Sequence, residues 1–65
     1  MTDRVAVLEI RERATRWKRD AVQLKRTAVE LDATNPDHAA ICRRDAETLN
    51  KLALREEELA AVLRS

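Results

Sequence analysis

Few side chains of this 65-residue chain have the chemistry needed for catalysis or for holding a metal ion. There is one histidine, His38, and one cysteine, Cys42. A zinc site takes several Cys or His ligands, and a nucleophile needs a base beside it. We therefore expect His38 to lie at the surface or its boundary and Cys42 to pack as a small hydrophobic residue. No metal or other cofactor is expected.

A run of three carboxylates is the remaining candidate for chemistry. Glu56, Glu57 and Glu58 could supply a general acid and a general base only if two of them converged on one point. Consecutive residues of a helix point in different directions, so these three diverge. We interpret them as a solvated acidic turn and predict that the protein is not an enzyme.

The single aromatic residue, Trp17, can be interpreted in three ways. It could fill a core, anchor an interface or form a platform on which a nucleic-acid base stacks. Ala14 and Ala21 flank it at helical spacing. Because such small neighbours make room for an indole ring, they favour packing in a core.

Helices are the only regular elements that this composition favours. The chain has no Gly, Phe or Tyr and one Pro, too few turn-forming and strand-forming residues for a sheet protein. Charged residues make up 38% of it, yet the net charge is only +1, as in helices with solvated outer faces. Since domains typically run to roughly 100 to 200 residues, we predict an all-α protein with a single domain over residues 1–65.

Pro36 marks the one break in the helical pattern. It lacks a backbone donor and keeps Asn35 out of the α region. Asn35 suits an N-cap, Pro36 suits a first helical turn, and Asp37 puts negative charge at the positive end of a helix. We predict helices over about residues 3–33 and 36–64 that form an antiparallel two-helix hairpin around a turn of about two or three residues.

Each predicted helix carries an apolar row with alternating spacings of three and four residues, which is typical of a coiled coil. The row of the first helix is Val7, Ile10, Ala14, Trp17, Ala21, Leu24, Ala28 and Leu31. The row of the second is Ala39, Cys42, Ala46, Leu49, Ala53, Glu56, Ala60 and Leu63. Small and large residues alternate in both, so that two helix backbones can approach closely. These rows predict the contact between the helices.

Nine large aliphatic residues lie outside these two rows. They are Val5, Leu8, Val22, Val29, Ile41, Leu52, Leu54, Leu59 and Val62. A hairpin has a single internal interface, so these residues need a second surface, and pairing two hairpins into a four-helix bundle provides one. We predict a homodimer of this kind, and a different protein could cover the same surface. The predicted interface residues are Trp17, Leu24, Leu31, Leu49, Leu52, Leu59 and Leu63.

Basic residues concentrate at the middle of the predicted hairpin. Nearer its open end, Arg11 and Arg13 would face the three glutamates of residues 56–58, which neutralise them. The middle segments, 16–26 and 43–53, have only three acidic residues. Their basic residues form a candidate band for phosphates or for an acidic protein face: Arg16, Lys18, Arg19, Lys25, Arg26, Arg43, Arg44 and Lys51.

Short sequences around the turn resemble the Rop family of plasmid RNA-binding proteins. They are Glu30-Leu31-Asp32-Ala33, Ala40-Ile41-Cys42 and Asp45-Ala46-Glu47-Thr48-Leu49. The resemblance implies a helical hairpin that dimerises into a four-helix bundle and binds RNA stem-loops with the outer face of its first helix. The family's RNA-facing positions fall on Val5, Glu12, Arg16, Asp20 and Thr27, of which only Arg16 suits an RNA contact. We therefore carry over the architecture and no functional residue.

Two functions follow from these patterns. The first is a small non-catalytic interaction protein of the adaptor, co-chaperone or inhibitor type, which associates with itself and with a protein partner. The alternative is a Rop-like RNA-binding regulator that uses the basic band. The N-terminal region carries a charge every few residues, so we expect neither a signal peptide nor a membrane span. The unpaired thiol of Cys42 favours a cytoplasmic location.

Overall fold

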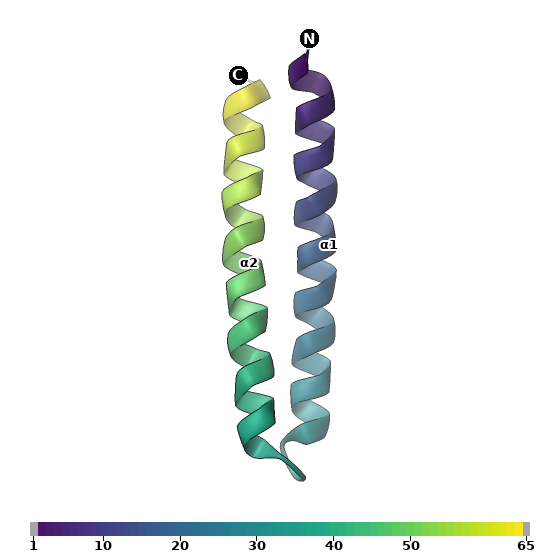
Figure 1. The fold of residues 1–65 in the computed structure, drawn as a ribbon, viewed down its shortest axis with the longest axis vertical. Coiled ribbons are helices and arrows are strands. Elements are labelled where there is room, and N and C mark those ends of the chain that lie inside the picture. The colour runs from purple at the N-terminus through teal and green to yellow at the C-terminus, as the bar shows by residue number, and fades with distance from the viewer. Residues whose placement is uncertain (1, 65) are drawn as a thin grey trace.

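The computed structural model describes the backbone of residues 2–64 and the side chains of residues 4–64. It consists of two helices, α1 (Thr2–Leu31) and α2 (Pro36–Arg64), and the described residues contain no strand. The helices run antiparallel and side by side, so that the start of α1 and the end of α2 lie at the same end of the molecule (Figure 1). The predicted all-α hairpin is confirmed.

The turn between the helices is organised by Leu31 and Asn35. The backbone amides of Thr34 and Asn35 donate to the carbonyl of Leu31 at 3.1 and 2.7 Å, which caps the end of α1. The side chain of Asn35 then accepts a hydrogen bond from the amide of His38 at 3.2 Å. This contact is that of an N-cap residue with the third residue of its helix, and it confirms the predicted start of α2.

The first helix ends two residues earlier than its sequence suggests. We predicted an end near Ala33, but α1 stops at Leu31, so the turn comprises residues 32–35 rather than two or three residues. Pro36 keeps Asn35 out of the helical region, and the chain must reverse direction before it reaches that residue. At this point the amides of Asp32 and Thr34 donate three residues back, to the carbonyls of Val29 and Leu31, so the regular four-residue pattern of the α-helix is lost and α1 ends.

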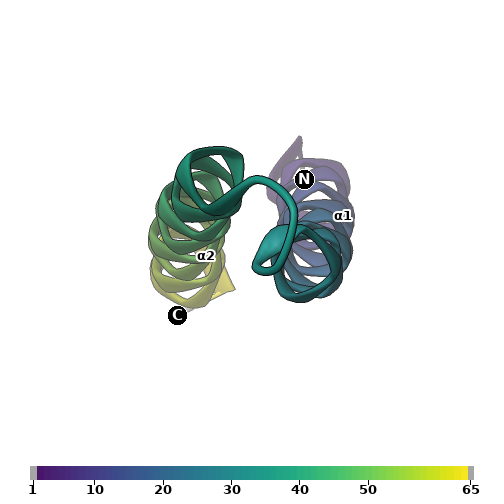
Figure 2. The ribbon, with the colours of Figure 1, turned by 90° about the horizontal axis from the view of Figure 1, so that it is seen from below.

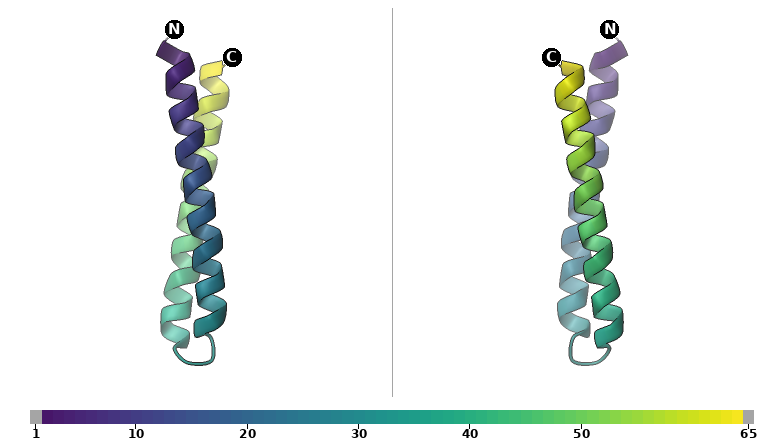
Figure 3. Two further views of the ribbon diagram at one scale, coloured as in Figure 1. Left: turned by 90° about the vertical axis from the view of Figure 1, so that its right-hand side faces the viewer. Right: turned by 90° about the vertical axis from the view of Figure 1, so that its left-hand side faces the viewer.

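The hairpin is long and thin. Its Cα atoms span 51 × 13 × 11 Å, and the end view shows two parallel columns bridged by the turn (Figure 2). In the side views the nearer helix leans across the farther one at a small angle (Figure 3). Such crossing is expected, because a seven-residue repeat stays in contact only if two 3.6-residue helices wrap around each other.

The buried core consists mainly of alanine. Seven of its members are Ala14, Ala21, Ala28, Ala39, Ala46, Ala53 and Ala60, and the other three are Val7, Ile10 and Cys42. The seven alanines and Val7 recur every seventh residue, four on each helix; we call these two series the alanine rows. Contacts of Ala28 with Ala39, and of Val7 with Ala60, set the register of the two helices. Five of the eight residues of each predicted contact row are thus buried between the helices.

No large side chain is fully buried among the residues described. All nine aliphatic residues outside the predicted rows are exposed, as the sequence indicates, and Leu63 is exposed with them. Trp17, Leu24, Leu31 and Leu49 belong to the predicted rows but are only half-buried. The hairpin therefore holds its helices together with small residues and leaves its large ones partly uncovered.

Candidate interaction surface

The alanine rows divide the surface of the hairpin into two faces of different character. Residues three positions after each alanine, or one position before it, lie on one side of the inter-helix contact, and residues four positions after it lie on the other. The first side is the apolar face, defined by Trp17, Leu24, Leu31, Leu49, Leu52, Leu59 and Leu63. The second is the charged face, defined by Arg4, Arg11, Lys18, Lys25, Arg43 and Glu57.

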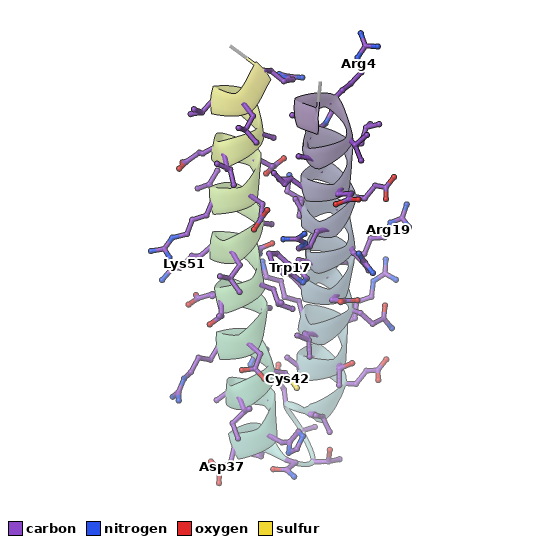
Figure 4. The ribbon with its side chains drawn as sticks, turned by 45° about the horizontal axis from the view of Figure 1, so that its top comes forward. Arg4, Trp17, Arg19, Asp37, Cys42 and Lys51 are labelled. Atoms are coloured by element: carbon purple, nitrogen blue, oxygen red, sulfur yellow. The ribbon has the colours of Figure 1, made fainter. Side chains whose placement is uncertain are left out.

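The centre of the apolar face is formed by half-buried side chains from both helices. Leu24 and Leu31 pack against the buried cluster of Ala28, Ala39 and Cys42. Leu24 and Leu49 line one shallow hollow, which shows that the face is continuous across the two helices. Trp17 lies between the helices near mid-length (Figure 4). These large side chains each have one side against the hairpin and another toward solvent.

Leucines extend this face along the outer half of α2. Leu52 is 37% exposed, Leu59 47% and Leu63 37%. They follow the spacing of the alanine row of α2, so they border the side of the contact on which Leu49 lies. By spacing, all seven predicted interface residues lie on this side of the contact, and at the open end of the hairpin Leu63 also lines a hollow with Arg4 and Arg11 of the charged face.

One polar pair interrupts the apolar face. Arg13 donates from Nη1 to Oε1 of Glu56 at 3.5 Å, as expected from the predicted facing of these segments. The side chain of Glu56 is only 19% exposed. Its Oε2 atom is buried and accepts no hydrogen bond from the described residues. A buried carboxylate oxygen without a hydrogen bond lowers the stability of the folded chain, so Glu56 is the least favourable residue of this face.

Two ion pairs lie on the charged face, one between the helices and one between the turn and α2. Lys18 Nζ lies 2.8 Å from Glu57 Oε2. Near the turn, Arg43 donates to both carboxylate oxygens of Asp32 at 2.8 and 2.6 Å. These hydrogen bonds lower the pKa of the Asp32 carboxyl below its ordinary value and raise the pKa of Arg43. Paired charges beside an apolar contact are typical of antiparallel coiled coils.

The eight residues of the candidate basic band are distributed over three sides of the hairpin. Lys18, Lys25 and Arg43 lie on the charged face, where Lys18 and Arg43 form the ion pairs just described. Arg16, Arg19 and Arg26 follow the outer edge of α1, and Arg44 and Lys51 follow the outer edge of α2. Figure 4 shows Arg19 and Lys51 extending in opposite directions. The hairpin alone does not gather all eight into one surface.

The residues considered for catalysis do not form one site. Cys42 is buried in the apolar cluster near the turn, as predicted, and His38 is exposed on the first turn of α2. Glu56 and Glu57 are bound to basic residues on opposite faces, and Glu58 is exposed. Among residues 4–64, no three His, Cys, Asp or Glu side chains gather to hold a metal ion.

Neither helix, over the described residues, has an apolar stretch of the length that crossing a membrane requires. Comparisons with protein-family models, with curated proteins and with solved structures found no match to this chain. The functional interpretation therefore rests on the arrangement of the side chains.

Two charged residues of the apolar face were not recognised from the sequence as candidates for an interface. Arg13 and Asp20 lie one heptad apart at the edge of this face, and Trp17 lies between them along α1. The signal was present in the sequence, because both residues immediately precede an alanine of the row. Asp45 holds the equivalent position before Ala46 on α2, so charged residues stand at this edge of both helices.

Proposed function

We propose that this chain is a small non-catalytic interaction protein whose apolar face mediates self-association into a four-helix bundle. The observation that carries the proposal is the inversion of the usual burial pattern. Alanines fill the core of the hairpin, while seven large side chains are partly or largely exposed on one face. Monomeric proteins rarely expose a contiguous apolar patch of this kind, and such patches mark interaction sites.

The size of the apolar face is adequate for a stable dimer. It runs the length of the hairpin, 51 Å between Cα extremes. Two helices side by side are about 20 Å wide with their side chains, so the face offers around 1,000 Å². A stable interface of standard size takes about 800 Å² from each partner. One hairpin can therefore supply its half of a bundle.

A second set of exposed aliphatic residues supports binding to a different protein. Leu8, Val22 and Val29 recur along α1, away from the apolar face, and remain uncovered when that face is paired. We propose that the bundle presents such outer surfaces to a protein partner, as an adaptor, co-chaperone or inhibitor does. The buried free thiol of Cys42 favours a reducing, cytoplasmic setting for this activity.

The alternative function is RNA binding through basic residues of the helix edges. Arg16, Arg19 and Arg26 line one edge of α1 and form no salt bridge with any described residue. A dimer would bring two such edges into one particle. This observation supports the alternative less strongly than the apolar face supports self-association, because phosphate recognition requires the charges to form one surface.

Glutamate substitutions test the proposed self-association directly. Leu52→Glu with Leu59→Glu places two carboxylates on the apolar face and should raise the dimer dissociation constant by about 100-fold or more. Ile41→Glu with Leu54→Glu is the matched control, because both residues are exposed on α2 but outside this face. Sedimentation equilibrium gives the mass of each variant and circular dichroism its helicity. Unchanged mass of a helical L52E/L59E variant would contradict the proposal.

A further inference from the structure

We infer that a groove at the open end of the hairpin, where α1 begins and α2 ends, binds an acidic amphipathic helix of a partner protein. The groove consists of two shallow hollows that share Leu8 and Arg11 among their lining residues. The first hollow spans the two helices, and the second continues it along the outer edge of α1. This inference rests on the proposed binding of a protein partner and names the chemistry of that partner.

Arginine is the commonest side chain of this groove. Five arginines line it: Arg4, Arg11, Arg16, Arg19 and Arg64. None of them forms a salt bridge with a described residue, because the basic residues of the described bridges are Arg13, Lys18 and Arg43. Glu12 is the one acidic residue among those that line the two hollows. The groove therefore has an excess of positive charge, which an acidic partner would complement.

The pairing of Arg11 differs from what the sequence predicts. The sequence analysis expected glutamates of α2 to neutralise it, but Glu56 binds Arg13 instead. Glu57 lines a neighbouring hollow together with Arg11, yet its Oε2 atom lies 2.8 Å from Nζ of Lys18. Arg11 is exposed and forms no salt bridge with a described residue, so its guanidinium is available to a carboxylate of a partner.

Apolar side chains lie in the groove beside these charges. Val7, Leu8 and Leu63 line the first hollow, and Leu8 is 55% exposed. An amphipathic helix can bury its own apolar residues against them, and an exposed apolar surface rimmed by polar residues is typical of protein–protein contacts. Arginine pairs with carboxylates through two parallel hydrogen bonds. A phosphate backbone would use the arginines but not the leucines, so the combination favours a protein segment.

The dimensions of the groove fit a short helix. The side chain of Leu8 lies between Arg11 on the charged face and Arg16 on the outer edge of α1. From Arg4 to Arg19 the groove extends along α1 for about 22 Å, which four turns of a partner helix would span. A helix that packs an apolar residue on Leu8 can then place carboxylates on both sides of its apolar stripe, beside arginines on both sides of the groove.

The groove stays open when the apolar face is covered. Leu8 and the arginines of α1 lie on the charged face or on the outer edge, and only Leu63 belongs to both surfaces. Binding of an acidic helix and self-association can therefore be measured separately on the same variants.

A model peptide tests the groove. We would use a labelled helical peptide of about 20 residues, with leucines at heptad spacing and glutamates on both sides of them, and follow binding by fluorescence anisotropy. Arg11→Glu with Arg16→Glu should weaken binding about tenfold or more, and Leu8→Ala about fivefold. The matched controls are Arg44→Glu with Arg55→Glu, on the outer side of α2, and Leu54→Ala, since Leu54 is also 55% exposed. These control variants should bind as the unchanged chain does.

The outcomes separate this inference from the proposed self-association. Equal weakening by the groove and control variants, or no binding by the unchanged chain, would overturn the inference, provided that circular dichroism shows all variants to be helical. Tighter binding of an RNA hairpin than of the peptide, with no effect of Leu8→Ala, would also overturn it. A chain that binds the peptide in this way but sediments as a monomer would support the groove and contradict self-association.

Discussion

Arg43 donates hydrogen bonds to both carboxylate oxygens of Asp32, at 2.8 and 2.6 Å, and so connects the turn to the second turn of α2. The two hydrogen bonds are parallel and charge-assisted, the strongest geometry for such a pair. Both side chains are about half exposed, so solvent screens the interaction and its contribution to stability is small. The Arg43–Asp32 pair therefore stabilises only the end of the hairpin at which the chain turns.

The Arg43–Asp32 pair should make the folded chain less stable as the pH falls. Arg43 lowers the pKa of Asp32 in the folded chain, chiefly through its hydrogen bonds. The stabilisation is then present above the pKa of an unfolded aspartate and is lost as the pH falls through the lowered value. Asp32→Asn should reduce the unfolding temperature at pH 7 and have a shrinking effect in acid. A constant difference at all pH values would contradict this role, and Glu47→Gln, at an exposed site within α2 that forms no salt bridge with a described residue, is the control.

Enlarging an alanine of the rows should destabilise the hairpin. Ala21 is 1% exposed and faces α2, so Ala21→Leu forces the helices apart at a cost of about 1–3 kcal/mol. The unfolding temperature followed by circular dichroism should fall by roughly 5–15 °C. Ala61→Leu, on the exposed surface of α2, should change it little. Equal stability of the two variants would show that the alanine rows are not the helix contact.

Removing the carboxylate of Glu56 should stabilise the assembly. Its Oε2 atom is buried without a hydrogen-bond partner among the described residues, and it lies on a face that the proposed dimer covers further. Glu56→Leu should therefore raise stability by roughly 1 kcal/mol, because the desolvation penalty disappears and apolar contact is gained. Glu58→Leu, on an exposed site, is the control. A destabilised E56L variant would mean that the Arg13–Glu56 pair outweighs that penalty.

Trp17 should report the association of the hairpins. It is half-buried in the single hairpin and would be covered by the second copy. Its fluorescence emission should shift to longer wavelength on dilution below the dimer dissociation constant, while the helicity changes in parallel or more slowly. The L52E/L59E variant, measured at high concentration, should show the emission of the diluted protein. Emission that is independent of concentration and equal in both proteins would contradict burial of Trp17 by association.

The sequence predicts most of the fold because local signals agree. Pro36 and Asn35 mark the break, and the repeat of three and four residues marks the contact, so the start of α2 needs no tertiary information. The end of α1 was misplaced at Ala33 because it depends on how the chain reverses toward Asn35, a property of the whole turn. Heptad spacing alone also could not show that the alanines take the contact while Trp17 and Leu49 remain half-buried. That division depends on how closely the two backbones approach.

The candidate surface was predictable in its residues but not in its organisation. The seven predicted interface residues combine members of the inter-helix rows with aliphatic residues outside them, and the register of the two helices brings them to one side of the contact. For the basic band the spacing within the sequence suggested a cluster, whereas Arg19 and Lys51 extend from opposite edges (Figure 4). Two residues can lie at the same level along the two helices and still point to different sides of the hairpin. The spacing of residues in the sequence indicates their level along the helix more directly than the side to which they point.

The most direct test of the account is the mass of the untagged protein in solution. We would lyse the expressing cells at low salt and pass the purified chain over a sizing column with light scattering and absorbance at two wavelengths. Self-association through the apolar face predicts one peak at twice the 7.5 kDa chain mass, with the absorbance of a protein that has one tryptophan. A helical peak at the mass of a single chain, stable at high concentration, would contradict the account. A peak dominated by nucleic-acid absorbance, removed by nuclease, would favour the RNA-binding alternative instead.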